Sequence, residues 1–299
     1  MSPVCLLCGE VGRLYYSDCQ DWEYFLAAGS DFYRCTNCGF IFMNPLPTRE
    51  ELPRFYPSTY HNFTPPTNPV SRFLLNCYHA RHVSICSRYL RSESSFLEIG
   101  SASGDLLERL RNRNYQNVQG VEISAEGYQR SREKDLKVFC GTLEEFSTDQ
   151  QFDMIFMSHV IEHVLDPLAA IKRITQLLKP GGILYLETPN VGCLDAKIWG
   201  RDWGLVHYPR HLYLFSRSTF HRLIQTGGLE VEQLWFEINS CGWALSLQNT
   251  FRRLNIDQSR RARSFYYPFL LLACMPLNLL NYCFCDGTAF MTAICRKRY

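Results

Sequence analysis

Four cysteines in two closely spaced pairs are the residues most typical of a metal site. Cys5-x2-Cys8 and Cys35-x2-Cys38 are each followed by a glycine, which permits the tight turn that directs two thiolates at one ion. Four sulfur ligands suit tetrahedral zinc and leave no open position for catalysis. We therefore expect a structural zinc that stabilises a small head over residues 1–44, with four unliganded core cysteines as the alternative. The 26 residues between the pairs exceed the usual ribbon spacing but hold enough aromatic residues for a hairpin.

A second segment, FLEIGSASGDLLERL, has the small residues of a ligand-binding loop. It places Glu98, Gly100 and Gly104 where a strand gives way to a helix, so that the backbone can approach a ligand. A dinucleotide fingerprint would need glycine at positions 100, 102 and 105, whereas Ala102 and Asp105 stand at the last two. A nicotinamide-dependent oxidoreductase therefore lacks two of its three glycines. A tight turn without a ligand is the other alternative.

Histidines gather in two later segments. His159, Glu162 and His163 follow the expected fourth strand at i, i+3 and i+4, so they can share one face. Three roles stay open for this group. The three side chains can bind a metal, His159 can transfer a proton or contact the acceptor, or the group can serve as structural hydrogen-bonding partners. In HYPRHLYLF, His207 and His211 are candidates for a general base. A buried polar network is the alternative for His211.

Elements that would position these residues follow from the apolar pattern. Asp166 is a good N-cap for a helix to Leu178, Pro167 suits its first position, and KPGG ends it. Short apolar runs lie at 95–99, 118–121, 138–140, 152–157 and 183–186. Strand and helix in alternation predict a parallel α/β sheet with right-handed crossovers and helices on both faces.

Prolines divide the chain. Seven of the 14 lie between residues 45 and 69, where missing donors disfavour regular helix and central strand. We expect a linker over 45–70, a domain over 71–299, and a helix capped by Ser71 at the start of that domain.

Composition restricts the class of protein. The 299 residues carry a formal charge of only +2, with 46% hydrophobic and 20% charged residues, as in folded globular proteins. Residues 1–44 hold two arginines against five acidic residues, which argues against phosphate contact and a nucleic-acid partner. The N-terminus lacks the pattern of a secretory leader, so we expect a cytoplasmic location with reduced cysteines.

Taken in order, five segments resemble the class I S-adenosylmethionine-dependent methyltransferases, in particular those with an N-terminal zinc ribbon. They are the ribbon followed by NPLPTREELPRFYPSTY, the loop LEIGSASG, the acidic VEIS, the run FDMIFMSHVIEHVLDPLAAI, and LKPGGILYLETPN. The resemblance covers nearly the whole chain. It implies a Rossmann-like seven-stranded sheet whose last strand is antiparallel.

The resemblance also implies which residues bind S-adenosylmethionine. Glu98, Gly100, Ser101 and Gly104 would surround the methionine moiety, and Glu122 would hold the ribose. Thr142 and Leu143 would border the adenine; Ala102, Ile123 and Ser158 complete the expected set. Ala102 stands where many members have glycine and Thr142 where aspartate is common, which bears on affinity more than on the cofactor's identity.

For the reaction, the family implies methyl transfer to a small molecule, here a hydroxyl of a sugar, sugar nucleotide or lipid-linked metabolite. A similar acid/His trio binds a divalent metal in ubiquinone-pathway O-methyltransferases, but His159 stands where that pattern has glutamate. A noncatalytic zinc-ribbon binding module remains the other alternative to an enzyme.

The stretch from Ser264 to Cys285 holds 22 residues without a formal charge and follows five arginines. Its length satisfies the minimum for a membrane span, but prolines and asparagines interrupt it, and GTAFMTAICRK after it is typical of a last strand. Two interpretations remain beside a span. One is peripheral membrane contact through residues 252–285, beside a basic patch. The other is a helical cap over 243–285 above the acceptor pocket.

Overall fold

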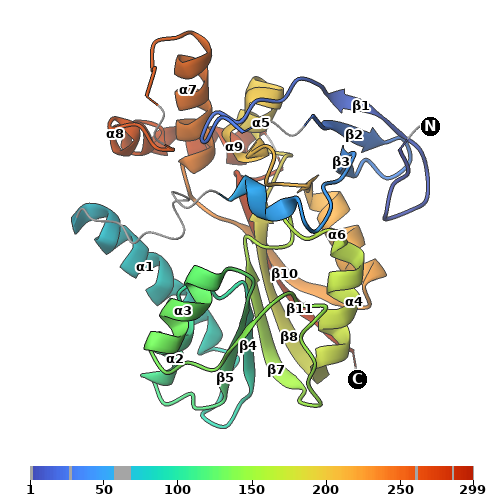
Figure 1. Ribbon diagram of the computed structural model, residues 1–299, viewed down its shortest axis with the longest axis vertical. Helices are drawn as coiled ribbons and strands as arrows, with labels where there is room; N and C mark the ends of the chain where they lie inside the picture. Colours follow the sequence, from blue (N-terminus) through green and yellow to red (C-terminus); the bar gives the residue numbers. More distant parts are fainter. Residues whose placement is uncertain (1–2, 27–28, 57–68, 260–261, 285, 299) are drawn as a thin grey trace.

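The computed structural model describes residues 3–26, 29–56, 69–259, 262–284 and 286–298. Figure 1 shows the large sheet in the lower part of the molecule, with the N-terminal ribbon at the upper right and the helices of the C-terminal tract at the upper left. The predicted 57–68 part of the linker lies outside the described residues.

The large sheet has seven strands in the order β10-β11-β8-β7-β4-β5-β6. They are β4 (Phe96–Ile99), β5 (Val118–Glu122), β6 (Val138–Cys140), β7 (Phe152–Ser158), β8 (Leu178–Pro189), β10 (Glu230–Phe236) and β11 (Phe290–Arg296). Strands β4 to β8 are parallel, and β11 is antiparallel to both β8 and β10. This confirms the predicted sheet and its antiparallel last strand.

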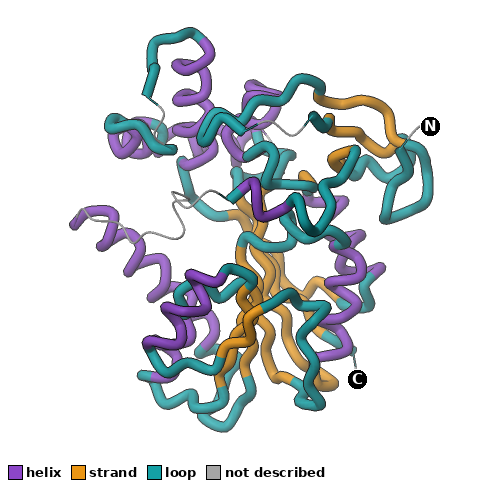
Figure 2. The backbone as a smooth tube through the Cα atoms, viewed as in Figure 1, coloured by secondary structure: helices purple, strands orange, loops and turns teal. Residues whose placement is uncertain are grey.

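Helices cover both faces of this sheet, and the strands run between them (Figure 2). They are α1 (Pro69–Cys86), α2 (Asp105–Arg111), α3 (Ala125–Glu133), α4 (Pro167–Leu177) and α6 (Arg217–Thr226). Successive strand residues point to opposite faces. Phe96 therefore packs in the core beneath α1 and α2, and Leu97 in the core beneath α4 and α6. The predicted helices on both faces are confirmed.

Local signals predicted the start of α4 but not the starts of α1 and β8. Asp166 caps α4 by accepting the backbone N–H of Ala169 at 2.9 Å. Helix α1 begins at Pro69, two residues before the predicted cap. Strand β8 starts at Leu178, directly where α4 ends, and runs through KPGG, so it is longer than expected.

The ribbon is not built from the head alone. Strands β1 (Gly12–Tyr16), β2 (Asp31–Cys35) and β3 (Ile41–Asn44) form an antiparallel sheet with β9 (Tyr213–Leu214) from the larger domain. The expected boundary at residue 44 therefore crosses a continuous sheet. After β3, the short helix η1 (Leu52–Phe55) lies in the first part of the expected linker.

The C-terminal tract folds into short helices before returning to the sheet. They are α7 (Cys241–Arg253), α8 (Tyr267–Ala273), η5 (Met275–Leu277) and α9 (Asn278–Phe284). They lie near α5 (Leu194–Trp199), η3 (Gly200–Asp202) and η4 (Gly204–Val206). Within the described ranges, we find no helix with both the length and the hydropathy to cross a bilayer.

Candidate functional site

The glycine loop joins β4 to α2 and needs glycine at two positions. Gly100 and Gly104 adopt φ values of 75° and 72°, a region in which side chains are strained. A Cβ at Gly100 would lie 2.4 Å from Val160 Cγ2, and one at Gly104 would lie 2.4 Å from Leu136 Cδ1. Both glycines are thus required by the turn and by packing inside the protein.

Glu122 at the end of β5 ties this loop to the next strand. Its Oε2 accepts the backbone N–H of Ala102 at 2.7 Å, and its Oε1 accepts that of Ser124 at 2.7 Å. Ala102 itself has φ 47°, so this hydrogen bond holds a left-handed residue. Each carboxylate oxygen of Glu122 retains a second lone pair that a ribose hydroxyl can use.

Two buried polar atoms of the loop have no hydrogen-bond partner, Glu98 Oε2 and Ser101 Oγ. Burial raises the pKa of Glu98 well above its usual range, and the charges of Asp105 and Glu122 add to that shift. A ligand that brings a positive charge and donors would satisfy these atoms. S-adenosylmethionine carries an ammonium and a sulfonium, so the residues present fit this cofactor.

The other expected cofactor residues differ in what they offer. Ile123 is 65% exposed, whereas the side chain of Leu143 packs in the core. The backbone N–H of Thr142 donates to Glu145 at 2.9 Å. Ser158 Oγ donates to Glu187 Oε2 at 2.9 Å. Of these four residues, Ile123 is therefore exposed and Leu143 is packed in the core, whereas Thr142 and Ser158 already form hydrogen bonds within the protein.

His159 follows β7 in a left-handed conformation with φ 54°. Its Nδ1 lies 3.6 Å from Glu162 Oε1 and its Nε2 3.5 Å from Glu187 Oε1. Burial alone lowers the pKa of His159, but the carboxylates of Glu187 and Glu162 more than offset this and raise it to about 10. His159 is therefore an imidazolium at neutral pH, and it is 35% exposed while both carboxylates are buried.

Glu187, at the end of β8, escaped the sequence-based set of site residues. Besides His159, it lies 3.3 Å from His82 Nε2 on α1 and accepts hydrogen bonds from Ser158 and Tyr185. The signal was present, since Glu187 belongs to the quoted segment LETPN at the carboxyl end of the fifth strand, where ligands bind in this class of sheet.

His207 and His211, the predicted candidates for a general base, both form contacts inside the protein. His207 Nδ1 lies 2.8 Å from Glu23 Oε2, and its Nε2 accepts from Arg210 Nε at 2.9 Å. His211 is 5% exposed, and its Nδ1 donates to the Leu205 carbonyl at 2.9 Å. Both nitrogens of His207 are engaged, and the contacts of buried His211 are compatible with the polar network given as its alternative; a general-base role for either residue stays a prediction.

Two groups of side chains have the spacing of metal ligands. The Sγ atoms of Cys5 and Cys38 are 3.6 Å apart, those of Cys8 and Cys35 are 3.4 Å apart, and all four lie within 4.8 Å of one another. Tetrahedral zinc with Zn–S bonds of about 2.3 Å separates its ligands by about 3.8 Å, whereas a disulfide needs about 2.05 Å. The donor set fits structural zinc.

The second group corrects the composition of the expected acid/His trio. Ligand atoms of Glu162, His163 and His211 lie within 4.8 Å of one another. His163 Nδ1 lies 2.9 Å from the carbonyl of Arg210, and His159 does not belong to this group. The metal hypothesis for this region therefore involves His211 in place of His159.

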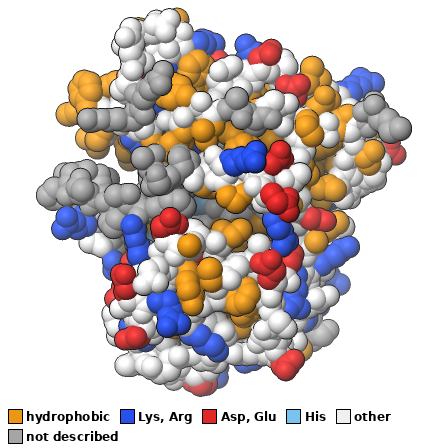
Figure 3. Space-filling model, viewed as in Figure 1, with side chains coloured by type: hydrophobic (Ala, Val, Ile, Leu, Met, Phe, Trp, Pro, Cys, Tyr) orange, Lys and Arg blue, Asp and Glu red, His pale blue; other side chains and the backbone are white. Residues whose placement is uncertain are grey.

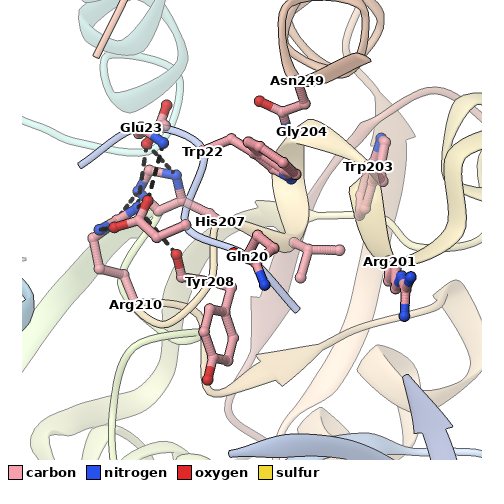
Figure 4. A pocket seen from close by; sticks show the side chains of 12 residues that line it. Gln20, Trp22, Glu23, Arg201, Trp203, Gly204, His207, Tyr208, Arg210 and Asn249 are labelled. Atoms are coloured by element: carbon pink, nitrogen blue, oxygen red, sulfur yellow. Dashed lines mark hydrogen bonds and ion pairs between the residues drawn. The ribbon is translucent and has the colours of Figure 1, made fainter. Parts of the chain in front are cut away.

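A small pocket lies where the head meets the later domain. Figure 4 labels residues that line it, and Glu23, His207 and Arg210 lie together among them. Sequence reasoning missed Asp21 and Glu23, although the unusually long spacing between the cysteine pairs marked their segment.

Known proteins share the fold and part of the sequence. The chain is 30% identical over 105 residues to a ubiquinone biosynthesis O-methyltransferase of Cereibacter sphaeroides, covering 33% of this chain and 42% of the relative. The corresponding protein of Bradyrhizobium sp. is 34% identical over 129 residues, covering 40% and 51%. The chain thus spans about half the length of these curated relatives.

Among solved structures, coclaurine N-methyltransferase bound to N-methylheliamine and S-adenosylhomocysteine aligns with a TM-score of 0.51 and 15% identity, covering 85% of this chain and 80% of that one. At this identity, the likeness shows the fold alone. A family model described as a methyltransferase domain matches residues 73–234, more than half of the chain. The chain therefore belongs to the class I S-adenosylmethionine-dependent methyltransferase family.

Proposed function

We propose that the protein transfers the methyl group of S-adenosylmethionine to a small-molecule acceptor, at a hydroxyl of a sugar, sugar nucleotide or lipid-linked metabolite. The observation that carries this proposal is the loop after β4, which Glu122 ties down and which leaves Glu98 Oε2 and Ser101 Oγ buried without partners. When bound, the cofactor supplies an electrophilic methyl group.

Different residues in and near this loop then bind different parts of the cofactor. Glu98 and Ser101, together with the two glycines, face the charged methionine end, while Glu122 holds the ribose hydroxyls. Exposed Ile123 offers an apolar surface to the adenine, beside Thr142. Alignment of acceptor and methyl group supplies most of the acceleration in such a displacement.

On the acceptor side, His159 is the residue we assign to contact the acceptor. It is more exposed than either carboxylate beside it, and its raised pKa keeps both ring nitrogens protonated at neutral pH. Its distances to the two carboxylates exceed a normal hydrogen bond, so its N–H groups remain able to donate to an acceptor oxygen. His159 thus orients the acceptor and does not act as a base near pH 7.

The head is proposed to bind one structural zinc through its four cysteines. Metal analysis of the purified chain should find about one zinc per chain. Replacement of Cys35 by serine should remove it, whereas replacement of the surface residue Cys140 should not.

The polarity of the C-terminal tract supports contact with a lipid surface and hence a lipophilic acceptor. Phe265 and Leu272 are 83% and 72% exposed, whereas Asn278 and Asn281 are buried. Hydrophobic side chains gather at the upper left of Figure 3, where α8 lies in Figure 1. Three arginines of the expected basic patch are engaged in ion pairs, namely Arg252 with Asp257, Arg253 with Asp202 and Arg263 with Glu23. Contact would therefore depend on apolar side chains.

Calorimetric titration tests the proposed function. S-adenosylmethionine and its demethylated product should bind with one site per chain, and NADH should not bind. Glu122→Ala should weaken cofactor binding at least tenfold. NADH binding would favour the oxidoreductase, and a chain that binds neither ligand would favour the noncatalytic module. Screening of sugars and lipid-linked metabolites with methyl-labelled cofactor would then identify the acceptor.

A further inference from the structure

The connection between β1 and β2 spans residues 17–30, far more than the two to five residues of a common hairpin loop. Residues 20–26, here called the ribbon loop, leave the small sheet as an ordered turn. Asp21 builds this turn, since its carboxylate accepts the backbone N–H groups of Glu23 and Tyr24 at 3.1 Å and of Leu26 at 3.2 Å.

The same carboxylate binds Arg210 in a bidentate pair. Asp21 Oδ1 and Oδ2 lie 2.8 and 3.0 Å from the guanidinium nitrogens, and both side chains are fully buried. The guanidinium also lies 4.9 Å from the ring centroid of Tyr24 and 3.4 Å from Glu23. Removing one partner of a fully buried pair leaves the other charge buried without compensation and is strongly destabilising, so this contact fixes the ribbon loop against residues 207–214.

Arg210 contacts the buried histidines on its other side. Its Nε donates to His207 Nε2 at 2.9 Å, so the ring proton of His207 lies on Nδ1 and is donated to Glu23. Its carbonyl accepts from His163 Nδ1 at 2.9 Å. The His211 ring lies 4.7 Å from His163 and 4.8 Å from His207. We call these three residues the histidine cluster; Figure 4 shows Glu23, His207 and Arg210 turned toward one another.

Further contacts hold the same segment between the ribbon and the residues after β7. The N–H of Met43 donates to the Leu212 carbonyl, and the N–H of Leu212 donates to the Glu162 carbonyl, each at 2.8 Å. His211 Nε2 lies 3.9 Å from Glu162 Oε1. Glu162 in turn lies beside His159, so a continuous line of packed groups runs from the ribbon loop to the acceptor side.

We propose that the zinc ribbon is the scaffold of the acceptor side, and that Arg210, held by Asp21 and Glu23 of the ribbon loop, is a positioning residue for the histidine cluster and thereby for His159. The inference rests on the proposed methyltransferase function. Glu98, Gly100 and Glu122 lie on or directly after β4 and β5, away from the ribbon sheet in the topology. Cofactor binding is therefore independent of the ribbon, whereas the histidine cluster is not.

The test uses the full chain labelled with ¹⁵N in histidine. Long-range ¹H–¹⁵N spectra report the protonation site of each imidazole, and single His→Gln variants assign the signals. Zinc-loaded wild type is compared with the chelator-treated chain, Arg210→Lys and Glu23→Gln. Asp18→Asn is the matched control, because Asp18 lies on the same connection, is 81% exposed and pairs only with Arg201 among the ion pairs of the described chain. S-adenosylmethionine is titrated into each by calorimetry.

Arg210→Lys and zinc removal should both displace the signals of the histidine cluster, and Glu23→Gln should displace His207. The dissociation constant for S-adenosylmethionine should stay within about threefold throughout, and Asp18→Asn should change neither readout. An unchanged histidine spectrum in Arg210→Lys or in the zinc-free chain overturns the proposal. Cofactor affinity that falls in step with the histidine signals also overturns it, because the ribbon would then stabilise the whole fold. Absence of cofactor binding in wild type counts against the proposed function instead.

If zinc removal unfolds the chain, the zinc-loaded variants decide the question. Arg210→Lys keeps the charge but loses the planar fork that matches Asp21. Glu23→Gln keeps an acceptor for His207 Nδ1 and removes only a charge, so it is the milder of the two. Retention of the wild-type His207 signal in both variants contradicts the scaffold role.

Discussion

At the scale of single residues, the protonation of Glu98 should change when the positively charged cofactor binds. Its pKa is raised by burial and by the neighbouring carboxylates, so the folded chain without cofactor favours the protonated carboxyl. A bound cation favours the ionised form, and binding of S-adenosylmethionine should therefore release protons. Calorimetry in buffers of different ionisation enthalpy measures this release.

The Glu98→Gln variant supplies the control for that measurement, since it keeps the shape of the side chain but has no proton to lose. Proton release should fall toward zero in the variant. Equal release in wild type and variant would assign the proton to another group and remove Glu98 from contact with the charged end of the cofactor.

His159 should make stability depend on alkaline pH. Its pKa rises from an ordinary 6.5 to about 10 in the folded chain because of Glu187 and Glu162, against the effect of burial. The stabilisation is therefore fully present below about pH 6.5 and is lost as the pH rises through about 10. His159→Gln, which carries no charge, should melt lower than wild type at pH 7, and the difference should shrink by pH 10.

Thermal melts of both proteins in matched buffers from pH 6 to 10.5 check this expectation. Every other titrating group is present in both chains, so the change of this difference near pH 10 is assigned to His159. A difference that stays constant across this range would mean that His159 is not an imidazolium held between two carboxylates.

Local residues of the site were predictable where a short segment determines its own shape. The segment LEIGSASG predicts its own turn, because its glycines Gly100 and Gly104 adopt positive φ values. The partners of Asp21 and Glu23 were not predictable in this way. Arg210 and Asp21 are 189 positions apart, and only the three-dimensional path of the ribbon loop brings them together.

At the scale of elements, the glycine loop carries a strain that can be measured. Ala102 has φ 47°, a conformation that costs an L residue roughly 1–2 kcal/mol. Glycine removes that cost, although its freedom in the unfolded chain offsets about 0.4–1 kcal/mol. Ala102→Gly should therefore raise the free energy of unfolding by up to about 1 kcal/mol.

Urea denaturation compares this variant with Ala169→Gly, an exposed alanine in helix α4. The control should lose up to about 1 kcal/mol, since glycine disfavours a helix. If both variants lose stability equally, the hydrogen bond from Ala102 to Glu122 does not hold a strained residue.

Elements differ in how far sequence determines them. Helix α4 was bounded by its own cap and stop residues, and β11 by its apolar run after the last glycine. Strand β9 has two residues, too few for a periodic signal, and it exists because β3 offers a free edge. The membership of β9 in the ribbon sheet therefore could not be read from residues 213–214 alone.

At the scale of the whole molecule, the order of strands and helices predicted the large sheet because each crossover has a fixed hand. The relation between ribbon and sheet had no such rule. It depends on ion pairs between distant segments, namely the buried pair of Arg210 with Asp21 and the partly buried pair of Arg263 with Glu23. Together with the backbone pairing of β3 and β9, these pairs connect the head to the later part of the chain.

The outward-facing apolar side chains of the C-terminal tract predict binding to neutral vesicles. Phe269 and Leu272 are 70% and 72% exposed on α8, and burying such a side chain contributes roughly 1.5–3 kcal/mol. Phe269→Ser combined with Leu272→Ser should therefore weaken partitioning into phosphatidylcholine vesicles at least tenfold. Leu14→Ser, at a 57% exposed leucine of the ribbon, should leave this partitioning unchanged.

Vesicle flotation should persist at about 0.5 M salt, where interactions between exposed charges are largely screened, because three nearby arginines are already paired within the protein. Wild type that stays in the soluble fraction with both neutral and anionic vesicles would leave the tract as a cap over the acceptor pocket and remove the argument for a lipid-linked acceptor.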